Sequence, residues 1–311
     1  MMPLVPDVTV RPLTQQDAPV LAALVNLLLS SALYSHPMSQ EMALAQALRR
    51  HPHTVFPTRL QQNRCLGAWR AGQLIGAIDV AVGFDSDTLD QPDYSPIGLL
   101  RFLMLPARSE LVSEAASALL NHAEEFWRSA GVGHVKAFHI STGYPAFQAG
   151  AGLLPGDWDE HVRVLTEQGY QFANRYYAVH RLLSDPVEEY LALAELGLVF
   201  RGTVDDRRYT VYRRRTEQIA SARLVRAEVE RDGVEQVVGL IPALYVDPHW
   251  RQRDLGKWLL SRMINDGLLQ KYHELVAYIS MEQNAAMNLL MQWGFEELHY
   301  RGYVLEKALA I

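Results

Sequence analysis

The chain has 311 residues, of which 49% are apolar and 21% charged, with a formal net charge of −6 and an isoelectric point near 6.0. This composition is ordinary for a globular chain with one large domain or two of common size. The acidic balance argues against a nucleic-acid or anionic-membrane partner, because phosphate binding needs a net basic face.

Cysteine usage and the first residues set further limits. Cys65 is the single cysteine, so no intramolecular disulfide can form, and no Cys/His cluster has zinc-ligand spacing. We therefore expect no metal site. The first ten residues contain no basic segment and no long apolar run, and no apolar stretch approaches the length of a membrane span. We expect a cytoplasmic protein without a membrane partner.

Hydrophobic periodicity in the first half predicts strands that alternate with helices. The expected strands are 8–12, 64–69, 74–82, 97–105, 135–140 and 176–183. The expected helices are 14–28, 40–49, 109–130 and a helix that ends before Gly169. A segment rich in Gly and Pro, residues 143–156, interrupts this half.

The second half follows the same plan in shortened form. Asp185-Pro186 predicts a helix start, with Asp as the cap and Pro at the first helical position. Asp232-Gly233 predicts a hairpin turn. The expected strands are 209–213, 219–230, 237–246, 275–280 and 300–309. The expected helices are 255–269 and 284–293.

The two halves share a pattern at their ends. Gly169-Tyr170 and Gly294-Phe295 are 125 residues apart, and each is followed by a similar strand. Pro106 and Pro248, which follow a central strand in each half, are 142 residues apart. The difference is about the length of the Gly- and Pro-rich segment. A period this long indicates duplication of a whole domain rather than a solenoid.

The segment from Val246 to Leu260 carries the clearest chemical signal. A strand ends, a tight loop contains Arg251 and Gly256, and an amphipathic helix begins. Free backbone N–H groups at a helix start suit an anion such as a pyrophosphate. Arg251, Arg253 and Lys257 add positive charge around this loop.

This segment resembles the acyl-CoA loop of the GNAT acetyltransferase superfamily, in which Val-x-Pro precedes Arg/Gln-x-x-Gly-x-Gly/Ala and a helix. The run from Glu282 to Phe295 resembles the second motif of that superfamily, and Arg11–Asp17 resembles its usual start. The resemblance implies an α/β (α+β) fold with two tandem GNAT-like domains, each a mixed twisted sheet flanked by helices. It also implies acetyl-CoA as co-substrate. The expected acetyl-CoA-binding residues are Val246, Arg251, Gln252, Arg253, Asp254, Leu255, Gly256, Lys257 and Asn284.

Three positions depart from the superfamily pattern, and one of them is Asn284, which lies one place later than the strict spacing. Asp254 stands where the first glycine is usual, and a carboxylate there could cap the helix and occupy the N–H groups that a pyrophosphate needs. A functional loop and a self-capped loop are both open alternatives. Leu290 occupies the place of the usual tyrosine, the common general acid of the superfamily.

The resemblance implies direct attack of an amine on the thioester, which requires a general base. Residues 237–245 contain no Asp or Glu, so Glu282 is the best remaining carboxylate, with a solvated loop acid as the alternative. Tyr245 and Tyr303 are candidate acid–base or substrate-contacting groups, with ordinary packing as the alternative. A backbone N–H within 244–246 is the expected donor to the thioester oxygen.

We predict an N-terminal domain, 1–184, that has lost acyl-CoA binding, and a C-terminal domain, 185–311, that carries the acyl-CoA loop. The expected activity is acetyl transfer to a primary amine of a small molecule in a ternary complex. The alternative is a non-catalytic protein of the same fold that binds CoA or a metabolite. The expected state is a monomer with pseudo-dimeric halves or a homodimer.

Overall fold

The computed structural model describes residues 8–55, 60–83, 96–106, 109–140, 142–190, 195–231 and 233–310. The chain forms two compact units, an N-terminal unit of Met1–Arg175 with Arg301–Ile311 and a C-terminal unit of Tyr176–Tyr300. The units therefore differ from the predicted division into 1–184 and 185–311. The physical reason lies in the last strand of each half, as shown below.

A six-stranded sheet forms the N-terminal unit, in the order β1-β2-β3-β4-β5-β13. Its strands are β1 (Thr9–Pro12), β2 (Leu60–Arg70), β3 (Gln73–Gly83), β4 (Ile97–Met104), β5 (His134–Ala137) and the end of β13 (Glu296–Ala308). Neighbours run antiparallel except β4 and β5, which are parallel. The short β6 (Leu154–Pro155) pairs with β13.

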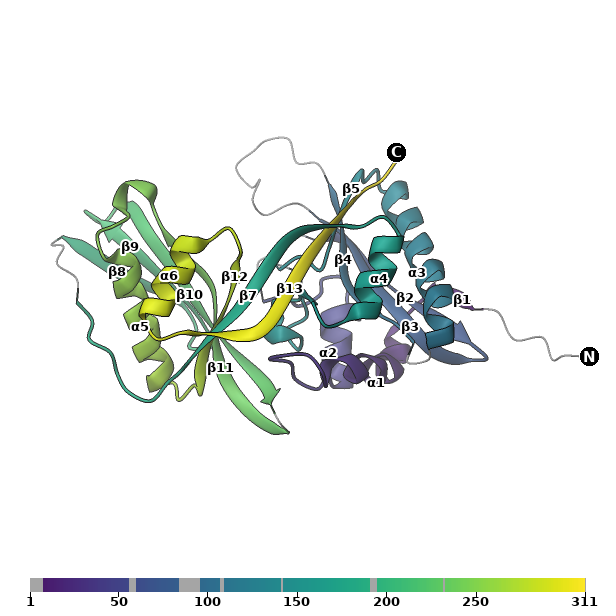
Figure 1. Ribbon diagram of the computed structural model, residues 1–311, viewed down its shortest axis with the longest axis horizontal. Coiled ribbons are helices and arrows are strands. Elements are labelled where there is room, and N and C mark those ends of the chain that lie inside the picture. The colour runs from purple at the N-terminus through teal and green to yellow at the C-terminus, as the bar shows by residue number, and fades with distance from the viewer. Residues whose placement is uncertain are drawn as a thin grey trace, which may run out of the picture. The chain divides into compact units, whose positions relative to one another are not determined.

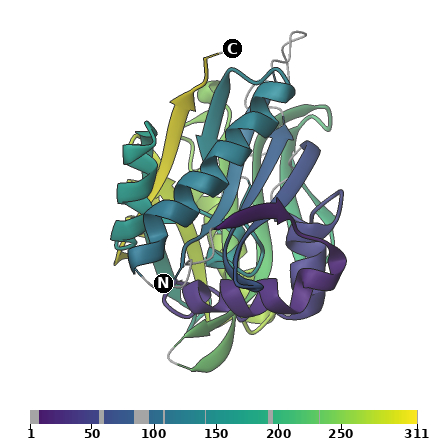
Figure 2. The same cartoon turned by 90° about the vertical axis from the view of Figure 1, so that its right-hand side faces the viewer.

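Helices cover this sheet and supply its core. They are α1 (Ala18–Leu29), α2 (Gln40–Ala43), which continues as a π-helical turn (Leu44–Leu48), α3 (Ser109–Ser129) and α4 (Asp159–Glu167). Figure 2 shows α3 crossing the strands of the N-terminal sheet. Leu21 of α1 and Leu119 of α3 are fully buried, as their positions in the apolar stripes predict.

The C-terminal unit repeats the plan with fewer helices (Figure 1). Its strand order is β7-β12-β11-β10-β9-β8, with β11 and β12 parallel and the other neighbours antiparallel. The strands are β7 (Gln171–Leu182), β8 (Leu196–Gly202), β9 (Asp206–Arg213), β10 (Glu217–Arg231), β11 (Val234–Val246) and β12 (Glu274–Ser280). The helices are α5 (Leu255–Leu269) and α6 (Asn284–Gln292). The predicted mixed α/β fold is confirmed.

The last strand of each half is exchanged. The strand after α4 is β7, and its residues 176–182 pair with β12 in the C-terminal unit. The strand after α6 is β13, and its residues 305–308 pair with β5 in the N-terminal unit. Gly169 and Gly294, which precede these strands, both have left-handed backbone (φ +84° and +73°) and end their helices alike. The repeat seen in the sequence is therefore present in the structure, but the final strand of each half pairs within the unit formed by the other half.

Two local predictions had different outcomes. The hairpin is confirmed, because β10 and β11 pair up to Arg231 and Val234 at the turn, although Asp232 lies outside the described residues. The helix from Asp185 is wrong, since residues 185–190 are not helical. There the Val187 N–H donates to Asn265 Oδ1 (2.8 Å), and Asn265 Nδ2 donates to the Val187 carbonyl (2.9 Å). These bonds tie the segment to α5 in a non-helical conformation.

No helix in the described part of the chain is both long and apolar enough to span a membrane.

Candidate functional site

The loop between β11 and α5 is held by local hydrogen bonds. Asp247 accepts from the His249 N–H (2.9 Å) and caps a short 3-10 turn, Pro248–Trp250. Arg251 follows with extended backbone, and its Nε donates to the carbonyl of Val246 (3.2 Å). This bond ties the loop to the end of β11.

Asp254 is the residue immediately before α5, and its backbone is left-handed (φ 58°, ψ 8°). Asp is one of the few residues other than Gly that tolerate this conformation. Its carboxylate makes no capping hydrogen bond to the helix and instead pairs with Lys257 Nζ (2.9 Å), both side chains being exposed. The self-capped alternative is therefore wrong for this geometry.

The start of α5 keeps its backbone donors available. The N–H groups of Leu255, Gly256 and Lys257 lack intrahelical partners by their position, and no other acceptor for them occurs among the described residues. The Leu255 side chain is buried and anchors this turn. A Cβ on Gly256 would lie 3.2 Å from Leu289 Cδ2 and 3.8 Å from Val246 Cγ2. The glycine thus lets helix, strand end and α6 approach closely.

The cations of the loop differ in their surroundings. Arg253 stacks over Trp250 (4.8 Å to the ring centroid), and Arg213 of β9 also lies over that ring (5.0 Å). Trp250 thus packs as an anchor for Arg253. Lys257 is paired with Asp254, so part of its charge is neutralised. Gln252 is exposed, with left-handed backbone (φ 60°).

Strands β11 and β12 form a wedge that opens toward this loop. Their parallel ladder joins only Val238–Leu240 to Glu274–Val276. Past it, β11 pairs with β10 and β12 with β7, and no pairing between β11 and β12 continues in the described residues. Alternate N–H groups of 241–246 therefore face the wedge without a strand partner. The predicted oxyanion donor, in 244–246, lies in this stretch.

The predicted catalytic residues do not all share one unit. Tyr245 is half exposed on β11, and Glu282 is exposed directly after β12, where its N–H donates to Ser280 Oγ (3.3 Å). Asn284 is the first residue of α6 and is exposed. Tyr303 belongs to the N-terminal unit, where its ring packs edge-on against Phe172 (4.9 Å). Tyr303 and the β11–β12 wedge therefore belong to different units.

Tyr278 of β12 was not singled out from the sequence. It lies past the last parallel pair of the wedge, and its buried hydroxyl has no hydrogen-bond partner among the described residues. Burial is the main cause of a raised pKa for this phenol, with a smaller contribution from Glu274. The sequence does contain a signal for it. Tyr278 alternates with Leu275, Ala277 and Ile279, which pack in the core, so its side chain is expected on the opposite face of the sheet.

The corresponding wedge of the N-terminal unit is filled by the chain itself. The ladder of β4 and β5 joins only Gly98–Leu100 to Val135–Ala137. Beyond it, the buried Arg101 donates from Nε to the carbonyl of Thr142 (3.1 Å). The buried ring of Phe102 stacks on Tyr144 (5.1 Å) and meets Phe147 edge-on (5.0 Å). The Gly- and Pro-rich segment thus occupies the space that stays unpaired in the C-terminal unit.

The loop before α3 is less informative. Pro106 follows β4 as Pro248 follows β11, but Arg108 lies outside the described residues.

Among the described residues, no group of three or more His, Cys, Asp or Glu side chains could hold a metal ion.

Comparison with solved structures gives the fold a name. A tandem GNAT protein from the clavulanic acid biosynthesis pathway superposes with a TM-score of 0.69 at 14% identity, covering 98% of this chain and 99% of that one. A GCN5-related glucosamine N-acetyltransferase region of a fungal multi-domain β-N-acetylglucosaminidase gives 0.70 at 12% identity, covering 97% of this chain and 38% of that one. A GCN5-related N-acetyltransferase from Sphaerobacter thermophilus gives 0.61 at 13% identity, with 99% and 98% covered.

No protein-family model matches the sequence, and a search of curated proteins found no match. The structural likeness shows that this chain has the GNAT fold, with two GNAT-like units in tandem. The predicted fold is thereby confirmed, and the predicted binding and catalytic residues stay predictions.

Proposed function

We propose that this protein is an N-acetyltransferase that uses acetyl-CoA in its C-terminal unit and acts on a primary amine of a small molecule. The observation that carries the proposal is the start of α5. Three backbone N–H groups are available there, Asp254 does not cap them, and Arg251 and Arg253 lie in the same loop. Such a helix start suits a pyrophosphate.

The residues present fit acetyl-CoA in a definite way. The N–H groups of 255–257 would hold the pyrophosphate, and Gly256 keeps side-chain atoms away from that end of the helix. When bound, acetyl-CoA supplies an activated acyl group. Unpaired N–H groups of 244–246 would stabilise the negative charge on the acyl oxygen.

Proton transfer is assigned to one group on β12 and one group just after it. Glu282 is the candidate general base for the amine, because it is an exposed carboxylate directly after β12. Tyr278 is the candidate proton donor to the leaving thiolate, because a phenol is protonated at neutral pH and this hydroxyl has no hydrogen-bond partner among the described residues. Tyr245, half exposed on β11, is a candidate contact for the acceptor.

Calorimetric titration of acetyl-CoA tests the cofactor site. We expect one site per chain, weakened in Arg251→Ala and abolished in Gly256→Glu, which would put a side chain and a negative charge into the cradle. Arg163→Ala is the matched control, because Arg163 is a surface arginine of α4 paired with Glu160 and Glu167. Absence of binding at millimolar acetyl-CoA would refute the proposal and leave the fold intact.

A release assay for free CoA thiol then tests catalysis over a panel of amines. The panel should include amino sugars, since one structural neighbour is a glucosamine N-acetyltransferase region. The competing proposal is a binding protein without catalysis. It is favoured by Leu290, which is buried in α6 at the position of the usual general acid. Saturable binding of acetyl-CoA with no thiol release for any amine would favour this second function.

A further inference from the structure

A cavity in the N-terminal unit has the chemistry of an anion site. It has a volume of about 420 Å³, within the usual range of small-molecule pockets. Its polar lining consists of Arg49, Arg50, Gln61, Gln62, Asn63 and Arg64. We call this space the basic cavity. It belongs to a different unit from the α5 loop and takes no part in the proposed transfer.

The basic cavity exists because an edge of the sheet is left uncovered. Strand β1 pairs with β2 only over residues 66–69, so residues 60–64 have no strand partner on that side among the described residues. The π-helical turn Leu44–Leu48 ends beside this edge and delivers Arg49 and Arg50. π-helical turns are uncommon and frequent at functional sites. Asn63 Nδ2 donates to the Arg49 carbonyl (2.9 Å), which fixes the turn against the strand.

Charge in the basic cavity is unbalanced. Among the described residues, no Asp or Glu lines it, and Arg49, Arg50 and Arg64 make no ion pair. The protein as a whole carries a net charge of −6, so three arginines gathered around one cavity without an acidic partner in the described part of the chain are contrary to its overall balance. Guanidinium groups bind carboxylate and phosphate oxygens through paired N–H donors.

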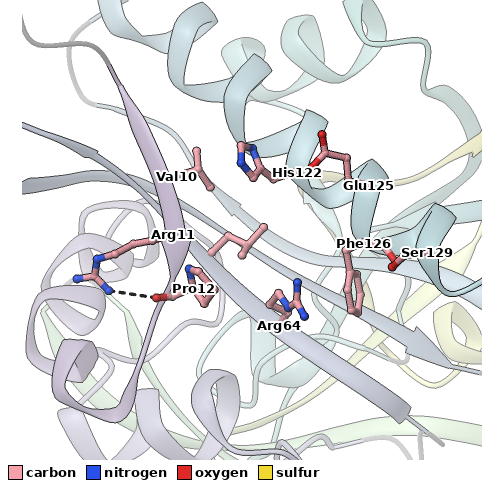
Figure 3. A pocket seen from close by; sticks show the side chains of 9 residues that line it. Val10, Arg11, Pro12, Arg64, His122, Glu125, Phe126 and Ser129 are labelled. Atoms are coloured by element: carbon pink, nitrogen blue, oxygen red, sulfur yellow. Dashed lines mark hydrogen bonds between the residues drawn. The ribbon is translucent and has the colours of Figure 1, made fainter.

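The wall of the basic cavity is partly apolar. The Arg64 guanidinium lies over the Phe126 ring (5.0 Å), and Figure 3 shows these two side chains next to each other. Figure 3 draws the adjoining cavity of about 210 Å³, which shares Arg64 and Phe126 with the basic cavity and also holds Glu125 and His122. Arg11 lines the adjoining cavity, but its guanidinium is paired with the Asp17 carboxylate (2.8 Å). Arg64 therefore lies between the basic cavity and the adjoining cavity, whose lining includes both acidic and basic side chains.

We propose that the basic cavity binds a small metabolite through a multiply charged oxyanion, either a phosphate ester or a polycarboxylate. The three guanidinium groups would hold the oxyanion, the side-chain amides of Gln61 and Gln62 would supply further donors, and Phe126 would contribute the apolar part of the lining. The site makes the N-terminal unit a binding module in its own right, although its wedge is filled.

The test is calorimetric titration of the full chain with inorganic pyrophosphate and, separately, with citrate at low salt. Pyrophosphate can also enter the α5 loop, so two variants separate the sites. One carries Arg49→Gln, Arg50→Gln and Arg64→Gln, and the other carries Arg251→Ala and Arg253→Ala. Arg163→Gln, which removes one positive charge elsewhere on the surface by the same type of substitution, is the control.

We expect the triple variant to bind the anion at the basic cavity at least about tenfold more weakly than the wild type. The control variant should bind it with wild-type affinity. The α5-loop variant should keep that same site, whether or not acetyl-CoA binding survives. Preference for pyrophosphate over citrate would identify a phosphate ligand, and the reverse a polycarboxylate. Unchanged binding in the triple variant, or no binding of either anion at millimolar concentration, would overturn the proposal. The three arginines are exposed, and thermal unfolding of the triple variant verifies that it folds.

Discussion

Asp254 and Lys257 form an ion pair at the first turn of α5, with 2.9 Å between Oδ1 and Nζ. The pair leaves the backbone N–H groups of the turn available, yet it keeps a negative charge beside the place where a phosphate would bind. It also removes much of the positive charge that Lys257 would otherwise offer. The loop therefore has free backbone N–H groups, but its positive charge is reduced by the Asp254 carboxylate.

Replacing the carboxylate should strengthen binding of acetyl-CoA. We expect Asp254→Gly to raise the affinity about fivefold, because an interaction of about 1 kcal/mol at a helix start is at stake. Asp254→Asn is the matched control for backbone shape, since Asn also tolerates left-handed backbone. Calorimetry on both variants measures the effect, and a similar gain in each assigns it to charge. A loss of affinity in both would show that Asp254 itself takes part in binding.

Tyr278→Phe should lower kcat about a hundredfold at an unchanged KM for acetyl-CoA, provided an acceptor has been found. The hydroxyl makes no hydrogen bond with the described residues, so its removal should leave the free energy of unfolding unchanged or higher. Tyr272→Phe is the control, because its hydroxyl bonds to the Val204 carbonyl (3.3 Å) elsewhere in the unit. Equal kcat values for wild type and Tyr278→Phe would remove Tyr278 from the mechanism.

The elements around the loop were predictable from the sequence. The apolar spacing after Asp254 gives α5 its observed bounds, and the apolar run that ends at Val246 gives β11 its end. Gly294 and Gly169 mark helix ends because only backbone without a Cβ takes left-handed angles freely. These are local effects, and local sequence encodes them.

Strand exchange could not be predicted in this way. The sequence of β13 shows that it is a strand, but its partner β5 is chosen by packing over a long sequence separation. Tyr303 was grouped with the C-terminal loop for that reason, and it lies in the other unit. The left-handed backbone of Asp254 and its ion pair with Lys257 are likewise not specified by residue type alone. Tyr278 escaped notice because a tyrosine in a strand usually packs.

Exchange makes the end of the chain essential to the N-terminal unit. Leu305 is fully buried and pairs with Ala137 of β5. We expect Leu305→Ala to destabilise this unit by about 3 kcal/mol, the typical cost of such a cavity. Hydrogen exchange measured by mass spectrometry should quicken in β5 and α3, and much less in 176–300. Glu306→Ala, a half-exposed position on the same strand, is the control. Faster exchange confined to 176–300 would contradict the assignment of β13.

A buried histidine should make the stability of the N-terminal unit depend on pH. His161 of α4 is 5% exposed, its Nε2–H donates to the Leu103 carbonyl (3.1 Å), and its ring lies 4.8 Å from Trp158. Burial lowers the pKa of His161 from 6.5 to about 4, against a smaller opposing effect of the hydrogen bond. The unfolded chain therefore binds more protons than the folded one between these two values. Stability contributed by neutral His161 is present above about pH 6.5 and is lost as the pH falls toward about 4.

The expected loss is roughly 3 kcal/mol across that interval, from the size of the pKa difference. His161→Gln keeps an N–H donor for the Leu103 carbonyl but cannot become charged, so its free energy of unfolding should fall less steeply with acid. Urea unfolding followed at several pH values between 4 and 7 measures both slopes. His122→Gln, at an exposed site on α3, should retain the wild-type slope. Parallel slopes for wild type and His161→Gln would mean that His161 is already protonated in the fold, because only a neutral buried imidazole generates the difference.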